Sequence, residues 1–334
     1  MEKDAPVSSF NQGRKRHDRG YNMVRLILIG LLAGFFFSST FVLNRMMSLE
    51  GGHWVWSASL RYGYMILFLV VWLMISRGMS QTVGLLKRFY RHLLFWVMAG
   101  SIGFGGFYAL ICFGADHAPG WVIAATWQFT IIATLVVLAG FGRRFPKKVW
   151  IFSGIVFAGV LMVNISQSDG VQSHAMLKGA LPMLLAAFCY PLGSQMVWEA
   201  VNGHDRLPKI WSPELDHPFV KILFMSLGTI PFWCVLVAVA APPAPSSGQL
   251  VKTALVAVLS GILATGIFFF ARNQAKTGNQ LAAVDATQSS EVIFALIAEV
   301  LIIGTALPNF WGMTGIAVTG LGIMLFIWFQ ESGG

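Results

Sequence analysis

Ten apolar blocks, each about as long as a lipid bilayer is thick, follow one another along the 334-residue chain and restrict what it can fold into. A membrane-spanning helix needs about 20 mostly apolar residues. The blocks lie at residues 23–46, 54–76, 92–115, 120–141, 149–166, 177–198, 219–241, 252–272, 281–304 and 308–329. Only 11% of the residues are charged, against roughly 25% in an average soluble domain. The sequence therefore predicts an all-α integral membrane protein with ten transmembrane helices.

Lysine and arginine residues are distributed unevenly between the loops that connect the blocks. If the loops alternate between two sides, nineteen of these residues fall on one side and only Arg45, Lys178 and Lys252 on the other. Basic loops remain in the cytoplasm, so we expect a multi-pass protein of the cell (plasma or inner) membrane with both termini cytoplasmic. Residues 1–22 are then a basic cytoplasmic tail rather than a signal peptide, and residues 199–218 a cytoplasmic loop between helices.

Short patterns recur in the same order in the two halves of the chain, at offsets of about 153 to 161 residues. Trp150-x3-Gly154-x4-Gly159 returns as Trp311-x3-Gly315-x4-Gly320, and the position of Gln128 corresponds to that of Gln288. A unit of five spans is odd in number, so its second copy is inverted in the membrane. Secondary transporters often have this architecture, with the substrate site near the midplane. We expect two inverted five-helix repeats, at 23–166 and 177–329; a duplicated membrane protein without transport is the alternative.

Several glycines of these blocks have a structural explanation. Gly154, Gly159, Gly312 and Gly315 are expected to let helices approach closely, because membrane helix interfaces favour small residues. The run GSIGFGG at 100–106 lacks the strand, the helix and the lysine of a phosphate-binding loop. Nucleotide binding is therefore not expected there.

Three segments make the sequence similar to a known family: FFFSSTFVLNR at 35–45, GGHWVWSASLRY at 51–62 and ATQSSEVIFALIAE at 286–299. They resemble the drug/metabolite transporter superfamily, in particular its branch of multidrug resistance efflux transporters, over about residues 24–329. The resemblance implies a ten-helix transporter, and members of the superfamily carry drugs, amino acids, sugars, nucleobases or lipid-linked intermediates. In small relatives a glutamate of the first helix binds a proton and a cationic drug alternately. Here the first block offers Asn44 and Arg45 instead, so the analogy with Glu291 is one of role and not of position.

The ninth block contains two glutamates, Glu291 and Glu299. Ionisable groups at bilayer depth are costly and face the protein interior or an aqueous cavity. At about 100° per residue, both glutamates share a stripe with small residues, opposite a bulky face. Near the midplane, Glu291 is the candidate for proton and substrate coupling, or else a carboxyl group bonded to Gln128, Asn44 or hydroxyl groups. Glu299 lies nearer the outer end, and we expect it to be structural.

Arg61 is the clear intramembrane basic residue of the second block. Three explanations fit it: its side chain reaches the lipid headgroups, it forms an ion pair with Glu299 or Glu50, or it contacts an anionic substrate. The sequence favours the first two.

Aromatic and amide side chains of the spans can form the lining of a central cavity. Such a lining suits flat or cationic lipophilic compounds, through stacking and cation–π contacts, although aromatic residues are also common in membrane spans for packing alone. The candidate substrate-binding residues are Gln288, Gln128, Trp127, Tyr190, Phe37, Gln195 and Asn44.

Enzymatic, metal and cofactor chemistry find little support in the sequence. His204, Asp205, Glu214, Asp216 and His217 share one loop, but three prolines divide it, and a solvated loop explains them better than a metal site. We expect a proton-coupled secondary exporter of small organic compounds, such as lipophilic or cationic drugs. The alternatives are a transporter of an endogenous metabolite or anionic lipid-linked intermediate, and a non-transporting membrane assembly partner. Expected partners are the substrate, protons and membrane lipids, without nucleic acid; the oligomeric state stays open, with a monomer preferred.

Overall fold

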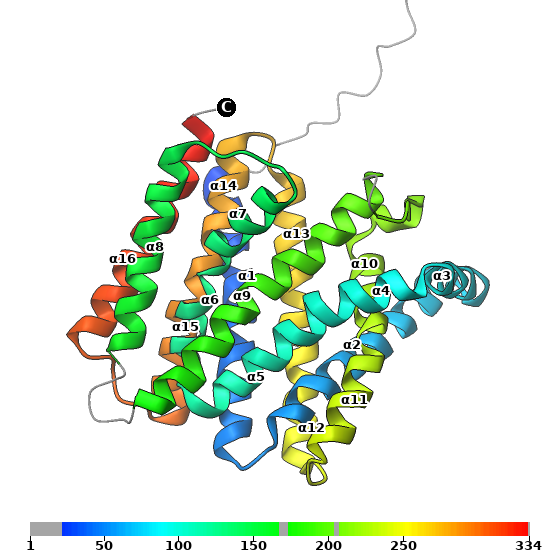
Figure 1. The fold of residues 1–334 in the computed structure, drawn as a ribbon, viewed down its shortest axis with the longest axis horizontal. Helices are drawn as coiled ribbons and strands as arrows, with labels where there is room; N and C mark the ends of the chain where they lie inside the picture. The colour runs from blue at the N-terminus through cyan, green and yellow to red at the C-terminus, as the bar shows by residue number, and fades with distance from the viewer. Residues whose placement is uncertain (1–21, 167–172, 204–206, 333–334) are drawn as a thin grey trace, which may run out of the picture.

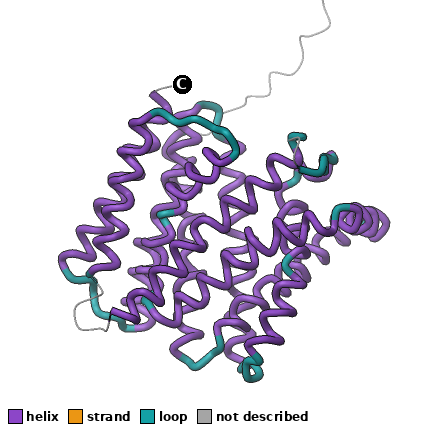
Figure 2. The backbone as a smooth tube through the Cα atoms, viewed as in Figure 1, coloured by secondary structure: helices purple, strands orange, loops and turns teal. Residues whose placement is uncertain are grey.

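The computed structural model describes residues 22–166, 173–203 and 207–332, and within these ranges the chain is helical, with no strand. Figure 2 shows long helices joined by short loops that gather at the ends of the bundle. The predicted all-α class is confirmed. Most of the expected basic tail (1–21), and His204 and Asp205 of the expected loop, lie outside the described residues.

Within the described residues, nine helical segments are long and apolar enough to cross a membrane, which indicates a multi-pass membrane protein. The remaining predicted span, the fifth at 149–166, corresponds to α8 (Lys147–Ile165), whose apolar part is shorter. The nine are α1 (Met23–Leu49); α2 (Trp54–Arg77); α4 (Leu93–Gly100), η1 (Ser101–Gly106) and α5 (Phe107–His117); α6 (Gly120–Trp127) and α7 (Thr130–Gly140); α9 (Ser173–Val201); α10 (Pro218–Gly228) and α11 (Ile230–Ala240); α12 (Ser247–Val256), η3 (Ala257–Ala264) and α13 (Thr265–Gln274); α14 (Gly278–Ala286), η4 (Thr287–Ser289), α15 (Ser290–Ala298) and η5 (Glu299–Ile303); and α16 (Phe310–Ser332).

Several spans are interrupted near their middle. The segments η1 and η3 are π-helical, and η4 is a short 3-10 turn between α14 and α15. Between α6 and α7, Gln128 and Phe129 form a turn. Non-α segments of this kind inside helices often mark functional sites. Pro119 ends the connection from α5 to α6, as the sequence predicted.

Helix α3 (Met79–Arg91) was not predicted, because its segment reads as a basic loop. It is amphipathic and buries Thr82, Leu85 and Phe89, which are spaced as one face of a helix. Figure 1 shows it end-on at one edge, running across the direction of the other helices. In the second half of the chain is a short 3-10 helix, η2 (Pro213–Asp216), whose Glu214 forms an ion pair with Arg88 of α3.

Helices α8 and α16 lie side by side at the other edge of the bundle (Figure 1), and glycines allow their close contact. A Cβ on Gly315 would lie 2.7 Å from the backbone nitrogen of Val163, and one on Gly159 would lie 2.8 Å from the carbonyl oxygen of Gly315. The expectation is confirmed for these two glycines and for Gly312, whose Cβ would lie 3.3 Å from the side chain of Trp121 on α6. It is wrong for Gly154, which has no neighbour within 4 Å of such a Cβ.

Candidate functional site

A cavity of about 740 Å³ lies among helices from both halves of the chain. Aromatic and aliphatic side chains form most of its lining. Among the described residues, four charged side chains line it: Arg61 on α2, Arg272 on α13, Asp285 on α14 and Glu291 on α15. The cavity therefore combines the apolar surface of a site for organic molecules with a small number of placed polar groups.

Glu291 reaches this cavity from the second residue of α15, directly after the 3-10 turn. Its side chain is 6% exposed, and its Oε1 accepts a hydrogen bond from Gln128 Nε2 at 3.0 Å. Gly34 of α1 permits this placement, because a Cβ there would lie 3.1 Å from the carbonyl oxygen of Thr287. Ile293 and Ile297 point outward, so the predicted bulky face of this span is confirmed. Glu291 both lines the cavity and has the amide partner that the sequence offered as an alternative.

Arg61 lies deep in the same cavity and is 9% exposed. Its guanidinium carbon lies 4.0 Å from the ring centroid of Tyr108 and 5.9 Å from that of Tyr62. Its Nη2 donates to Ser260 Oγ at 3.4 Å, whereas its Nε has no hydrogen-bond partner. Ser260 in turn accepts a hydrogen bond from Thr40 Oγ1 at 2.6 Å, which links α1 to η3.

The ion pair suggested for Arg61 is not formed. Glu299 is fully buried elsewhere and accepts hydrogen bonds from the backbone nitrogens of Gly120 at 2.7 Å and Trp121 at 3.1 Å. Glu50 pairs with Lys252 at 2.6 Å. The explanation of Arg61 by an ion pair is therefore wrong, because the first nitrogens of α6 donate to Glu299 and Lys252 of α12 pairs with Glu50.

Aromatic rings form one side of the cavity. Tyr190 of α9 lies parallel to Phe104 of η1, with ring centroids 6.5 Å apart and planes 2° apart. Phe107 and Trp127 complete this group, with centroids 4.9 Å apart. A flat apolar molecule could stack on such a surface.

At its other end the cavity approaches solvent between α13 and α14. Arg272 Nε lies 3.3 Å from Asp285 Oδ1, and the two side chains are 39% and 36% exposed. Ser260 lies twelve residues before Arg272 in the same continuous span, which corresponds to about 18 Å along a helix. We call the region of Arg272 and Asp285 the mouth of the cavity, and the region of Arg61 and Ser260 its floor.

Most of the predicted site residues are brought together here. Glu291, Gln288, Gln128, Trp127, Tyr190, Phe37 and Arg61 line the cavity. Asn44, Gln195 and Glu299 are not among its lining residues. Asn44 donates to Tyr108 Oη at 2.8 Å, and Gln195 donates to Glu199 of its own helix at 2.9 Å.

Arg272, Asp285 and Ser260 are among the lining residues that sequence reasoning did not predict. Arg272 and Asp285 lie near span ends, where a charged residue is ordinarily solvated or an entrance residue, although their separation by one short connection could have suggested a pair. Ser260 is a single hydroxyl in an apolar block, and single serines are ordinary there. Among the described residues, no group of three or more His, Cys, Asp and Glu side chains lies close enough together to hold a metal ion.

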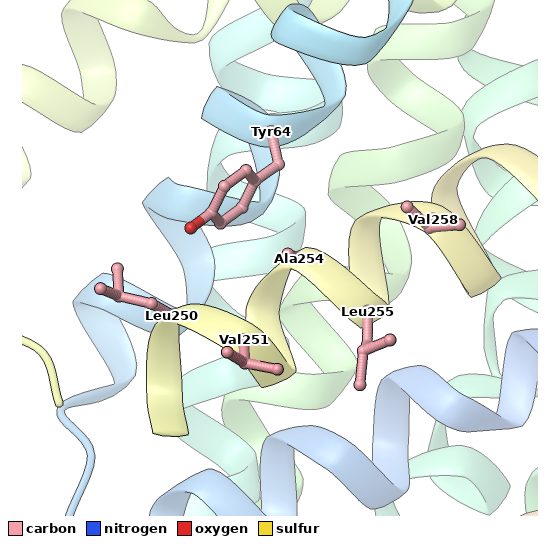
Figure 3. A pocket seen from close by; sticks show the side chains of 6 residues that line it. All are labelled: Tyr64, Leu250, Val251, Ala254, Leu255 and Val258. Carbon is pink, nitrogen blue, oxygen red and sulfur yellow. The ribbon is translucent and has the colours of Figure 1, made fainter. Parts of the chain in front are cut away.

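A second hollow, of about 310 Å³, lies between Tyr64 of α2 and the α12–η3 segment. Figure 3 shows its six lining side chains, which are Tyr64, Leu250, Val251, Ala254, Leu255 and Val258. None is charged, and Val251 is 61% exposed. An outward-facing apolar hollow of this kind suits lipid chains better than a polar substrate.

Comparisons with known proteins show which family and which relatives the chain is similar to. The EmrE family model, described as "Putative multidrug resistance efflux transporter", matches residues 24–332. The chain is 36% identical over 318 residues to the uncharacterized protein YjlA of Bacillus subtilis (strain 168), across 90% of this chain and 94% of that protein. It is 32% identical over 308 residues to an uncharacterized 42.1 kDa protein of Shouchella clausii from the intracellular alkaline protease 3' region, across 86% and 77%.

A solved structure described only as "Crystal structure of protein" is also similar, with a TM-score of 0.58. The similarity covers 92% of this chain and 99% of that one, at 13% sequence identity. At this identity the likeness concerns the fold alone.

Proposed function

Because the chain belongs to the EmrE family of multidrug resistance efflux transporters, in the drug/metabolite transporter superfamily, we propose that it is a proton-coupled secondary exporter of small organic compounds. The observation that carries the proposal is Glu291, a buried carboxyl group at the side of a central cavity with Gln128 as its hydrogen-bond partner. Burial opposes the charged form of a carboxyl group, so a bound proton or a substrate cation can each stabilise it in turn. Exchange of one for the other couples transport to the proton gradient.

The two halves are inverted five-helix repeats, 23–166 and 177–329, with α8 as the fifth of ten spans. Two features support this beyond the sequence patterns. The π-helical segment of the third span, which starts at Ser101, has a counterpart that starts 156 residues later, at Ala257. The turn at Gln128 has a counterpart in the 3-10 turn that contains Gln288. Both separations agree with the sequence offset.

In this proposal both termini are cytoplasmic, and the mouth of the cavity faces the cytoplasm. The distribution of basic residues supports this orientation, since Arg272 belongs to the side that holds nineteen of them. At the floor, a hydrogen bond from Thr40 to Ser260 joins the two halves, and another from Gly120 to Glu299 joins them outside the cavity lining. The ion pair of Glu50 and Lys252 joins them as well. We interpret the arrangement as an inward-facing state, from which alternating access opens the opposite end.

The test uses purified protein in liposomes with an imposed pH gradient and ethidium, a lipophilic cation, as the probe. The wild type should accumulate ethidium in response to the gradient, and Glu291→Gln should abolish this response. Glu299→Gln is the matched control, since it changes a second buried carboxyl group of the same span outside the cavity lining. Gradient-independent uptake, or a normal response in Glu291→Gln, contradicts coupling through Glu291. Absence of uptake of ethidium and of the other probes described below favours the non-transporting alternative.

A further inference from the structure

We propose that Arg61 binds an anionic group of the substrate, such as a carboxylate, sulfonate or phosphate, at the floor of the cavity. The inference rests on the proposed function only in treating the cavity as the transport site. It assigns one substrate class, compounds with an anionic group on an apolar body, in addition to the cations that compete for the proton of Glu291.

The first step concerns the partners of the guanidinium group. Arg61 is nine-tenths buried, yet its polar contacts are with neutral groups: a 3.4 Å hydrogen bond to Ser260, a side-chain hydrogen bond with Tyr108, and the faces of the Tyr62 and Tyr108 rings. Its Nε has no acceptor. No carboxylate among the described residues forms a salt bridge with it. A buried charge without a counter-ion is costly, and an arginine that lines a cavity in a membrane span is a functional candidate.

The second step is the charge balance of the cavity. Arg272 and Asp285 neutralise each other at the mouth. Glu291 carries no charge while it holds a proton, and its partner Gln128 is neutral. Arg61 is then the uncompensated charge among the described lining residues. An anion that enters from the mouth therefore meets a cavity with a net positive charge, and this positive charge lies at the floor.

The third step is the shape of the surroundings. Phe104, which lies parallel to Tyr190, also packs against Tyr62, with ring centroids 5.5 Å apart. Tyr62 lies in turn next to the guanidinium group of Arg61. A molecule held by an anionic group at Arg61 can thus lay a flat apolar body on these rings. Guanidinium groups bind planar or tetrahedral oxyanions through two parallel hydrogen bonds, and the Nε of Arg61 has no other acceptor that would compete with such a ligand.

The test measures binding to purified protein in neutral detergent with three probes that share one ring system and differ in charge. They are naphthalene-2-sulfonate, 2-naphthylmethanol and (naphthalen-2-ylmethyl)trimethylammonium. The wild type should bind the sulfonate most tightly. Arg61→Gln should weaken sulfonate binding by about tenfold or more and leave the neutral alcohol unaffected. Arg144→Gln, an exposed loop position, is the matched control and should behave as the wild type.

Two further probes separate the source of the anion: 2-naphthyl phosphate, a soluble phosphate ester, and dihexanoyl phosphatidylglycerol, a short-chain lipid. Binding of 2-naphthyl phosphate or of the phosphatidylglycerol in preference to its neutral analogue supports the proposal. Preference for the first indicates a soluble substrate, and preference for the second indicates a lipid. Equal binding of all charges, preference for the ammonium probe, or no sulfonate binding at millimolar concentration overturns it. The wild-type preference decides the matter even if Arg61→Gln fails to fold. Preference for the ammonium probe would overturn the anion site while leaving the proton-coupled exporter intact.

Discussion

Glu299 Oε1 accepts a hydrogen bond from the backbone nitrogen of Gly120 at 2.7 Å, although 179 residues separate the two in the chain. The adjacent nitrogen of Trp121 donates to the other carboxylate oxygen. The first backbone N–H groups of a helix lack partners within it, and a negative charge near this end is stabilising. Glu299 therefore holds the start of α6 against η5, which explains a buried carboxylate without invoking transport.

We predict opposite consequences for the two glutamates of this span. Glu299→Ala leaves two buried donors without an acceptor, and each lost bond to a charged group is worth about 1.5–3 kcal/mol. The melting temperature in detergent should fall clearly, whereas the pH dependence of transport by the surviving protein should remain. Glu291→Gln should show the reverse. Equal loss of stability in both variants would contradict this division.

The close packing of α8 on α16 predicts a position-specific effect of added methyl groups. Gly159→Ala places a Cβ against Thr319 and the backbone of Gly315, so the helices must separate and the melting temperature should fall. Gly154→Ala is the matched control, because its Cβ would meet open space. That variant should be neutral or slightly stabilising, since alanine favours helix by about 1 kcal/mol over glycine. Similar melting temperatures for the two variants would show that the helices tolerate separation.

If the two halves separate at the floor during transport, a cross-link there should stop transport. Thr40 and Ser260 join the two halves, with their hydroxyl oxygens 2.6 Å apart. In a background without Cys112, Cys189 and Cys234, the double variant Thr40→Cys/Ser260→Cys should lose transport on oxidation and regain it on reduction. Transport by each single variant should be unchanged by oxidation and by reduction. Unchanged transport by a fully cross-linked sample would mean that the two halves do not separate there.

The sign of proton coupling should follow the charge of the substrate. A cation near Glu291 competes with its proton, so the ammonium probe should be exchanged for protons. An anion at Arg61 raises the proton affinity of a nearby carboxyl group, so the sulfonate should move together with protons. A pH-sensitive dye inside the liposomes distinguishes the two probes. Entry of the ammonium probe in exchange for protons should make the interior more alkaline, and entry of the sulfonate together with protons should make it more acidic. Protein-free liposomes supply the control, and the same sign for both probes would contradict the scheme.

The stability of the first turn of α10 should depend on pH, because the side chain of His217 caps this turn. Its Nδ1 accepts a hydrogen bond from the backbone nitrogen of Phe219 at 3.3 Å. Burial and the charge of Arg77 lower the pKa of His217 below its usual value. The cap therefore contributes fully above the unfolded pKa of about 6.5 and is lost as pH falls through the lowered folded pKa. Amide exchange at Phe219 should accelerate at acid pH beyond its intrinsic rate. His217→Asn keeps a capping side chain and should remove the acceleration; identical profiles would exclude His217 as its cause.

The sequence predicted the helical class, the short connections and several of the polar and aromatic lining residues, because these depend on long apolar blocks, prolines and polar groups at membrane depth. It did not predict α3, since its three basic residues obscured the apolar spacing of Thr82, Leu85 and Phe89. Nor could it distinguish the partners of Arg61 and Glu299. The donors to Glu299 are backbone groups, which leave no trace in the residue types. The turn at Gln128 and Phe129 likewise contains neither glycine nor proline, so it depends on tertiary contacts.

The ion pair at the mouth has a kinetic consequence. Arg272 and Asp285 present a nearly neutral dipole to the solvent, so charged molecules are neither concentrated nor repelled there over distances beyond the Debye length of about 8 Å at physiological salt. Electrostatic steering makes association rates fall steeply with ionic strength. Any salt dependence of substrate capture should therefore come from the other basic residues of this side, and the ion pair itself should not select among substrates by charge.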